Sequence, residues 1–368
     1  MTTLQVIVDE ILNPSSPEVA RYSEELTRAL IPLAPRGCVV DGFVSASTDP
    51  QYNQLLADLP GLGTLNKSAL ARRELTAAWQ HGFTRLPGRG MVHAPSLFAP
   101  LARHDRLNEG DQIVVTVHDT LAWTTPQEVP SRTASWQRAM AKRAERYADA
   151  VVVPTHAVAQ SVSELLNFGD RVRVISPAAS TSLAIPDDED AVADSLGLPG
   201  HYVLVRGAAH PGSRIAEVVD ALRAIDDGTE LVLVEEGVVP DSITELGQQP
   251  GIHLYRDLGS ASLAVAIDRA QVVVDIERSA ENLIGLLDAL SLGTPVVHWD
   301  SANLREIAAD STIIVENDGD GDALTEALRN VLSDTELAER LCLLGADRSR
   351  AFGWRGSAEK VWQLHADL

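Results

Sequence analysis

The chain has 368 residues, 45% of them hydrophobic and 22% charged, and it carries a formal net charge of −22. A single hydrophobic core rarely serves a chain of this length, so length and composition indicate two globular domains. The sequence contains no run of 18 or more apolar residues, so we expect no membrane-spanning helix. The charge excludes nucleic acid as an expected partner, because neutralising phosphates requires clustered basic residues.

The negative charge is concentrated in the second half of the chain. Residues 1–180 contain 17 Lys and Arg against 18 Asp and Glu, a net charge of −1, and the remainder contains 13 against 34, a net charge of −21. An anionic ligand expected in the second half would therefore meet an unfavourable long-range potential.

The N-terminus and the cysteines indicate the cytoplasm. The chain begins directly with an apolar segment at residues 4–8, without a basic region or long apolar stretch ahead of it. Cys38 and Cys342 match no metal or redox spacing, so both are expected to be small core residues in a reducing compartment. We expect a cytoplasmic protein without a metal site.

Short runs rich in Val and Ile alternate with longer stretches of helical periodicity along the chain. This alternation predicts α/β domains with parallel sheets covered on both faces. The clearest predicted strands are residues 4–8, 113–118, 150–154 and 172–176 in the first half, and 202–206, 231–235, 252–255, 272–276, 295–299 and 312–315 in the second. Between the two series, residues 177–195 contain prolines, small residues and an acidic run, so we place the interdomain linker there.

Residues just after each strand are the first candidates for a ligand site, because open α/β sheets bind ligands beyond the carboxyl ends of their strands. His118 ends a predicted strand, and Asp119, His156, Gly207 and the loop 277–285 follow the ends of predicted strands. A dinucleotide-binding dehydrogenase is excluded, because residues 10–17 contain no glycine-rich turn after the first strand. No P-loop sequence occurs either.

Several segments, in the right order, resemble the retaining glycosyltransferases of family 4. They are Val115–Thr120 (VTVHDT), Ala148–Val153 (ADAVVV), Arg171–Pro177 (RVRVISP), Tyr202–Pro211 (YVLVRGAAHP), residues 270–297 ending in GTPVV, and Arg350–Trp354 (RAFGW). The resemblance covers most of the chain. It implies a GT-B architecture, in which two Rossmann-like doubly wound α/β domains face each other across a cleft. We expect an acceptor domain at residues 1–180 and a nucleotide-sugar domain at residues 181–352, with a last helix at about 353–368 packing back on the first domain.

The resemblance also implies site residues. His118 corresponds to a histidine that faces the donor sugar near the reacting centre, and we expect it to be catalytic. The residues expected on the acceptor side are Arg21, Tyr22, His93 and Asp119. Those expected to bind the donor are Arg206, Gly207, Arg214, Glu281 and Asp288, with guanidinium groups for the diphosphate and carboxylates for the ribose hydroxyls. Gly207 and Gly293 are also expected where the backbone needs positive φ.

Three positions depart from the family pattern. Residues 16–22 (SPEVARY) replace a glycine-rich loop, and without glycine the backbone cannot approach an anionic ligand as closely. The family's phosphate-binding lysine aligns with Ser213, so a neighbouring arginine must substitute for it with different geometry. The first of two glutamates on the donor helix aligns with Ala280, and Glu281 lies one position late.

Two functions remain open. The first is a metal-independent enzyme, without a cofactor, that transfers a sugar from a nucleotide diphosphate sugar to a hydroxyl acceptor with retention. The second is a degenerate glycosyltransferase-like scaffold or recognition subunit that partners an active glycosyltransferase. The departures and the acidic second half favour the scaffold, whereas His118, Asp119 and Asp288 favour the enzyme.

Residues 135–147 (SWQRAMAKRAERY) form a predicted basic amphipathic helix. Such a helix is able to contact an anionic membrane surface peripherally, but more often its apolar side packs on the sheet. We favour packing for this helix and for the apolar stripe of Trp354, Ala358 and Val361. For His156 we favour a structural role.

Overall fold

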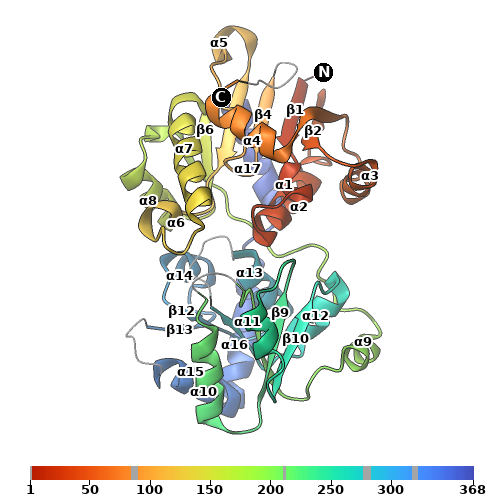
Figure 1. The fold of residues 1–368 in the computed structure, drawn as a ribbon, viewed down its shortest axis with the longest axis vertical. Helices are drawn as coiled ribbons and strands as arrows, with labels where there is room; N and C mark the ends of the chain where they lie inside the picture. Colours follow the sequence, from red (N-terminus) through yellow and green to blue (C-terminus); the bar gives the residue numbers. More distant parts are fainter. Residues whose placement is uncertain (1, 84–89, 210–212, 277–282, 317–321) are drawn as a thin grey trace. The chain divides into compact units, whose positions relative to one another are not determined.

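The computed structural model describes residues 2–83, 90–209, 213–276, 283–316 and 322–368. The chain divides into two compact units, each an α/β sheet with helices on its faces (Figure 1). The first unit comprises Met1–Pro177 together with Gly353–Leu368, and the second comprises Ala178–Phe352.

The first unit contains a seven-stranded parallel sheet in the order β3-β2-β1-β4-β5-β6-β7. Its strands are β1 (Thr2–Ile7), β2 (Cys38–Ala46), β3 (Leu65–Ala71), β4 (Met91–Ala94), β5 (Gln112–Thr116), β6 (Ala150–Val153) and β7 (Val172–Val174). Its helices are α1 (Asp9–Leu12), α2 (Pro17–Leu30), α3 (Asp49–Asp58), α4 (Arg72–His81), α5 (Arg106–Glu109), α6 (Leu121–Thr124), α7 (Ser131–Tyr147), α8 (His156–Leu165) and α17 (Trp354–Asp367). The strand order reverses between β1 and β4, which places the ligand crevice of such a sheet at their carboxyl ends.

Hydrophobicity predicts β1, β5, β6 and β7 of this sheet. Every residue of β5 and β6 is buried, as expected for a parallel strand covered on both faces. Strands β2, β3 and β4 were absent from the predicted series. β2 contains Asp41 and Gly42, β3 alternates exposed and half-buried residues at the sheet edge, and β4 is only four residues long. Their strand conformation depends on pairing with β1 rather than on an apolar run.

The last helix, α17, packs on the first unit against α2. Trp362 is almost fully buried and donates its indole N–H to the carbonyl of Leu30, 3.1 Å away. Ser357 donates to the carbonyl of Ser176 at 2.7 Å, and the ring of Trp354 packs against the edge of Tyr22. The apolar stripe at Trp354, Ala358 and Val361 is buried, as the spacing predicts.

A buried histidine pair also ties α17 to the sheet. His93 on β4 and His365 on α17 are both buried, with Nδ1 of His93 3.4 Å from Nε2 of His365. The Nδ1 of His365 lies 2.9 Å from the side-chain oxygen of Gln112. Burial lowers the pKa of His93 to about 4 and holds the pKa of His365 well below its usual value, so both rings are neutral near pH 7.

This pair predicts acid sensitivity. The unfolded chain binds protons at histidine as the pH falls below about 6.5, whereas folded His93 resists protonation until about pH 4, so folding stability should fall across that window. The expected loss is about 1.4 kcal/mol per pH unit for each group. Urea unfolding followed by tryptophan fluorescence should show a weaker pH dependence in His93→Gln than in the wild type. The same substitution at the exposed His81 should leave the pH dependence unchanged.

The second unit contains a six-stranded parallel sheet in the order β10-β9-β8-β11-β12-β13. Its strands are β8 (Tyr202–Arg206), β9 (Glu230–Glu235), β10 (Ile252–Arg256), β11 (Val272–Asp275), β12 (Val296–Trp299) and β13 (Ile313–Val315). Its helices are α9 (Glu189–Leu196), α10 (Ile215–Ile225), α11 (Asp241–Leu246), α12 (Ser260–Asp268), α13 (Leu283–Leu292), α14 (Ala302–Ala308), α15 (Asp322–Ser333) and α16 (Thr335–Ser349). The strand order reverses between β8 and β11, and the ends of these strands form the ligand edge.

The second unit differs from the sequence-based expectation at the linker and agrees with it at two glycines. Part of the segment expected to be the linker is helical, because α9 occupies Glu189–Leu196 and ends at Gly197 with positive φ. Gly207 and Gly293 have φ of 73° and 78°, a conformation that residues with a Cβ rarely adopt, which confirms the need for glycine at both positions.

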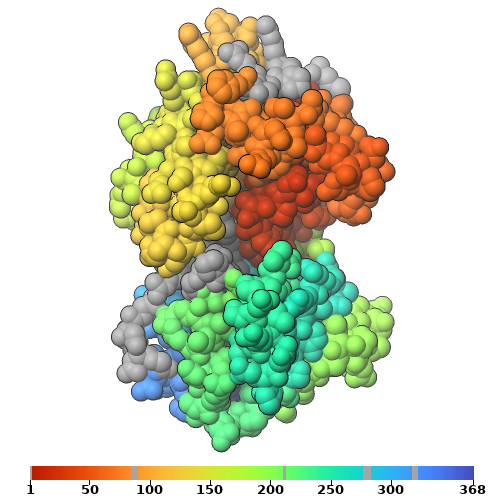
Figure 2. All heavy atoms as spheres, in the orientation of Figure 1, coloured from red at the N-terminus to blue at the C-terminus, as the bar shows by residue number. Residues whose placement is uncertain are grey.

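The basic helix α7 packs on its unit through Ala134, Met140, Ala141 and Ala144, which are all buried. Part of the segment that contains α7, in yellow, lies at the surface (Figure 2), and the Lys142 side chain is 68% exposed and pairs with Glu145. Within the described residues, no helix is both long and apolar enough to cross a bilayer.

Candidate functional site

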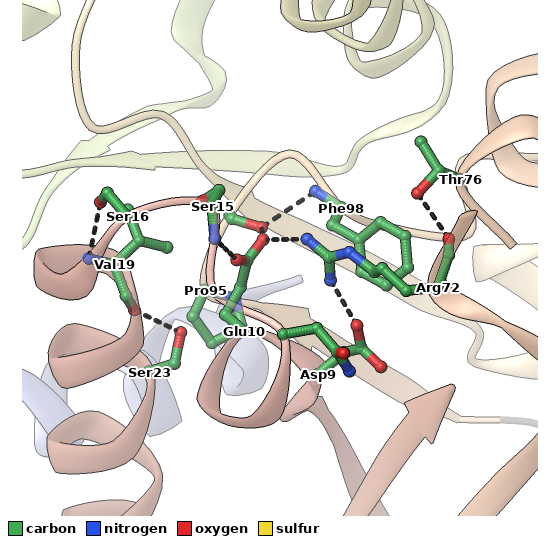
Figure 3. A network of polar contacts seen from close by, with 12 residues as sticks. Asp9, Glu10, Ser15, Ser16, Val19, Ser23, Arg72, Thr76, Pro95 and Phe98 are labelled. Carbon is green, nitrogen blue, oxygen red and sulfur yellow. Dashed lines mark hydrogen bonds and ion pairs between the residues drawn. The ribbon is translucent and has the colours of Figure 1, made fainter. Parts of the chain in front are cut away.

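The ligand edge of the first unit is organised by two carboxylates at the start of α1, one residue after β1 ends. Asp9 and Glu10 are at most 1% exposed, and both pair with the guanidinium of Arg72 at the start of α4. Figure 3 shows this guanidinium between the two carboxylates, stacked on the ring of Phe98 at 3.6 Å from its centroid. Glu10 also accepts from the hydroxyl of Ser96, which lies beyond β4, at 2.9 Å.

The same carboxylates hold two further segments of the edge. The second oxygen of Glu10 accepts from the backbone N–H of Ser15 at 2.8 Å, in the turn before α2, and Asp9 accepts from the N–H of Ser45 in β2 at 2.6 Å. This turn lies where the resemblance expects a glycine-rich loop. Its conformation is set by a carboxylate that accepts hydrogen bonds and not by glycine.

His118 lies just beyond the end of β5, half-buried beside this network. Its Nε2 is 2.7 Å from the carbonyl oxygen of Pro95, and the edge of its ring meets Tyr22 at a centroid distance of 4.7 Å. Because a carbonyl oxygen only accepts, Nε2 must carry the proton and Nδ1 is the acceptor of the neutral ring. Burial lowers the pKa of His118, and the Pro95 carbonyl and the charges of Asp119 and Glu10 oppose that shift.

The other residues expected on the acceptor side differ in what they can contact. Tyr22 is 3% exposed and packs between His118 and Trp354, so it shapes the surroundings of His118. Burial raises the pKa of Tyr22. Arg21 pairs with Glu18 at 3.2 Å, and Asp119 accepts from the backbone N–H of Leu121 at 2.7 Å, which closes the turn after β5.

His93 does not join this set. It is fully buried within β4 and packs against His365, so the acceptor-side role expected of it has no exposed atom to act through in this structure. His93 lies within a strand between apolar residues, as a core residue does.

The ligand edge of the second unit brings Arg206 and Asp288 together. Arg206, the last residue of β8, has a side chain only 12% exposed, and its guanidinium lies 3.3 Å from the Asp288 carboxylate on α13 and 3.5 Å from that of Glu236. Asp288 is fully buried and also accepts from the backbone N–H and the hydroxyl of Ser180. In this arrangement the Asp288 carboxylate positions Arg206, and its expected contact with ribose stays a prediction.

Arg214 is held in a different way. It precedes α10, and its Nε and Nη2 are both 2.6 Å from the carboxylate of Glu217. Its guanidinium also stacks on the ring of Trp299 at 3.4 Å from the centroid. The hydroxyl of Ser213 donates to the carbonyl of Ala208 at 2.8 Å.

Glu235, which the sequence analysis did not single out, lies at the end of β9 beside Ala209. It is 3% exposed and accepts from the backbone N–H of Ala209 at 3.2 Å. Burial raises its pKa, and the hydrogen bonds from the Ala209 and Ala208 amides oppose that shift. Residues 210–212 and 277–282 lie outside the described residues, so Glu281 and the Ala280 position have no structural account here.

The sequence-based prediction also did not include Asp9, Glu10 and Arg72. Asp9 and Glu10 directly follow the first predicted strand, which is the position at which ligand residues are sought. This position alone marks both carboxylates as candidate site residues. Arg72, 62 residues further along, carries no local pattern that would pair it with them.

Comparison with known proteins gives a family match for part of the chain. Residues 19–183 match the family Glycosyltransferase Family 4. A comparison with curated protein sequences finds no match.

Solved structures of low sequence identity share the fold over nearly the whole chain. Sucrose-phosphate synthase from Thermosynechococcus elongatus is 19% identical with a TM-score of 0.75, and the match covers 100% of this chain and 99% of that one. HepE from Anabaena, in complex with UDP and glucose, is 15% identical with a TM-score of 0.71 and 100% coverage of both chains. WaaG, a glycosyltransferase involved in lipopolysaccharide biosynthesis, is 14% identical with a TM-score of 0.64 and 98% coverage of both chains. The fold is therefore that of GT-B glycosyltransferases, with two Rossmann-like domains, as the sequence predicts.

Proposed function

We propose that this chain is a retaining, metal-independent glycosyltransferase that transfers a sugar from a nucleotide diphosphate sugar to a hydroxyl acceptor. The observation that carries the proposal is the state of His118, a neutral histidine of fixed tautomer at the ligand edge of a unit that matches a glycosyltransferase family. The UDP and glucose in the related HepE structure are consistent with a nucleotide sugar as donor.

In this proposal the protein contributes binding and electrostatics, without a cofactor. Nδ1 of His118 accepts a hydrogen bond from a sugar hydroxyl near the reacting carbon, while Nε2 stays bound to the Pro95 carbonyl. Arg206 stabilises the negative charge that develops on the leaving diphosphate, since charge-assisted hydrogen bonds from guanidinium to phosphate are strong and directional. Cys38 and Cys342 are both half-buried, and not core residues as the sequence predicts. Both are free thiols, which fits a cytoplasmic site of action.

Calorimetry against UDP, GDP and their sugars tests the proposal. We expect saturable binding of one nucleotide with a dissociation constant at or below the millimolar range, equal to about −4 kcal/mol or more favourable. Incubation of the donor sugar with hydroxyl acceptors should then release the nucleoside diphosphate, detected by coupled assay. Release that persists at full rate with excess EDTA supports metal independence, and loss of the rate rejects it.

One observation favours a second candidate, the scaffold that partners an active glycosyltransferase. Both arginines expected to bind phosphate are already paired with carboxylates of their own unit: Arg206 with Asp288 and Glu236, and Arg214 with Glu217. A diphosphate must compete with these pairs inside a strongly acidic half of the chain. The scaffold predicts no saturable nucleotide binding at millimolar concentration, so the same titration separates the two candidates.

A further inference from the structure

A single side chain, Glu10, ties three segments of the ligand edge together. One of its oxygens accepts from Arg72 at 2.8 Å and from the Ser96 hydroxyl at 2.9 Å, and the other accepts from the Ser15 N–H at 2.8 Å. These partners belong to the start of α4, the loop after β4 and the turn before α2 (Figure 3). Moving the Glu10 carboxylate would therefore disturb all three segments.

Stability alone does not account for this arrangement. Two carboxylates, each at most 1% exposed, share one guanidinium, whose side chain is 22% exposed. Desolvating buried ion pairs often costs as much as their attraction returns, and apolar side chains of similar volume frequently serve stability as well. What the network does provide is a fixed geometry, because every segment it holds is bound through a directional hydrogen bond.

The network reaches His118 through the loop after β4. Ser96 is bonded to Glu10 through its hydroxyl, which also accepts from the backbone N–H of Phe98 at 3.0 Å. The residue before it, Pro95, presents the carbonyl that accepts from Nε2 of His118. A shift of Ser96 therefore moves the acceptor that sets the tautomer of His118.

We propose that Glu10, held in place by Arg72, is a positioning residue that fixes the Pro95 carbonyl and thereby the tautomer and ring orientation of His118. The inference rests on the proposed glycosyl transfer, since it gives His118 a defined acceptor atom for a substrate hydroxyl. The same carboxylate also orders the turn before α2, because it accepts from the Ser15 N–H. The chain uses a buried carboxylate to order this turn, which the resemblance expects to be glycine-rich.

The variants that test the proposal are Glu10→Gln and Ser96→Ala. Glutamine has nearly the shape of glutamate but only one acceptor oxygen, so its amide nitrogen must face either the Ser15 N–H or the donors of Arg72 and Ser96. Ser96→Ala removes the link between Glu10 and the loop, together with the hydrogen bond that the Ser96 hydroxyl accepts from the Phe98 N–H. Glu359→Gln is the matched control, because Glu359 pairs with Arg355 on the exposed side of α17, where both side chains are more than half exposed.

Two measurements are made on the full chain. Histidine side-chain ¹⁵N NMR reports the tautomer of His118, with its resonances assigned by their loss in His118→Ala. Steady-state kinetics separate kcat from the KM for the donor sugar. In Glu10→Gln we expect the Nε2-protonated form of His118 to lose its dominance and kcat to fall by about tenfold to a hundredfold, with KM changed less than about threefold. Ser96→Ala should change both in the same direction to a smaller extent, and Glu359→Gln should match the wild type.

Unchanged His118 resonances in both folded variants would overturn the proposal, as would a loss of activity carried only by KM. If Glu10→Gln does not fold, Ser96→Ala decides alone. If the wild type transfers no sugar, the proposed function fails, yet the NMR comparison still decides whether Glu10 sets the state of His118.

Discussion

His118→Ala is expected to lower the turnover of glycosyl transfer by about 10²–10⁴-fold while the fold stays intact. The ring lies at a strand end and is half-buried. Among the described residues it makes a hydrogen bond to Pro95 and an edge contact with Tyr22, so its removal should leave the fold intact. The measurement is kcat with saturating donor and acceptor, together with circular dichroism and the melting temperature. Nucleotide affinity should be unaffected, because the expected phosphate ligands belong to the second unit.

His156→Ala is the matched control for this prediction. His156 also follows a strand of the first unit and is exposed, but it begins α8 and is expected to be structural. Its variant should keep wild-type turnover. Wild-type turnover in His118→Ala would reject the catalytic role. The lowered pKa of His118 adds a second check: activity that needs the neutral ring should persist to a lower pH than the titration of an ordinary histidine allows.

The sequence predicts the sheets well because their strands are buried on both faces. Runs such as those of β5, β6 and β8 have no polar face to alternate with, so composition alone marks them. Strands β2 and β3 were harder to predict, since one contains Asp41 and Gly42 and the other is a partly exposed edge strand. Edge strands depend on their neighbour for hydrogen bonds, and a local sequence window carries little of that information.

The site is predictable only in its outline. Strand ends point to His118 and Arg206, and the structure places both at the ligand edges of their units. The partners of these residues come from distant positions: Asp288 lies 82 residues from Arg206, and Arg72 lies 62 residues from Glu10. Such pairings follow from the topology of the folded sheet, and no spacing rule in the sequence specifies them.

The donor site yields the second large effect, through Arg206→Ala. If Arg206 binds the diphosphate, its loss should weaken nucleotide binding by about ten- to a hundredfold, as expected for one charge-assisted hydrogen bond of roughly 1.5–3 kcal/mol. The variant should also be less stable, by about 3–5 kcal/mol at most, because the buried Asp288 keeps its bonds from Ser180 but loses its cation. Arg223→Ala, at an exposed ion pair of the same unit, is the control and should change neither quantity.

Asp288→Asn and Arg214→Ala test whether Asp288 contacts the ribose and Arg214 the phosphate of the nucleotide. Asp288 is fully buried and bonded to Ser180 and Arg206, so asparagine should keep its place while removing a negative charge beside the guanidinium. Nucleotide affinity measured by calorimetry should then stay constant or rise, by up to about tenfold or 1.4 kcal/mol. A fall in affinity at unchanged stability would instead establish the ribose contact expected from the resemblance. Arg214, clamped by Glu217 and Trp299, should affect affinity less than Arg206 does. Saturable binding of UDP or GDP that ignores all three substitutions would place the donor site elsewhere in the second unit.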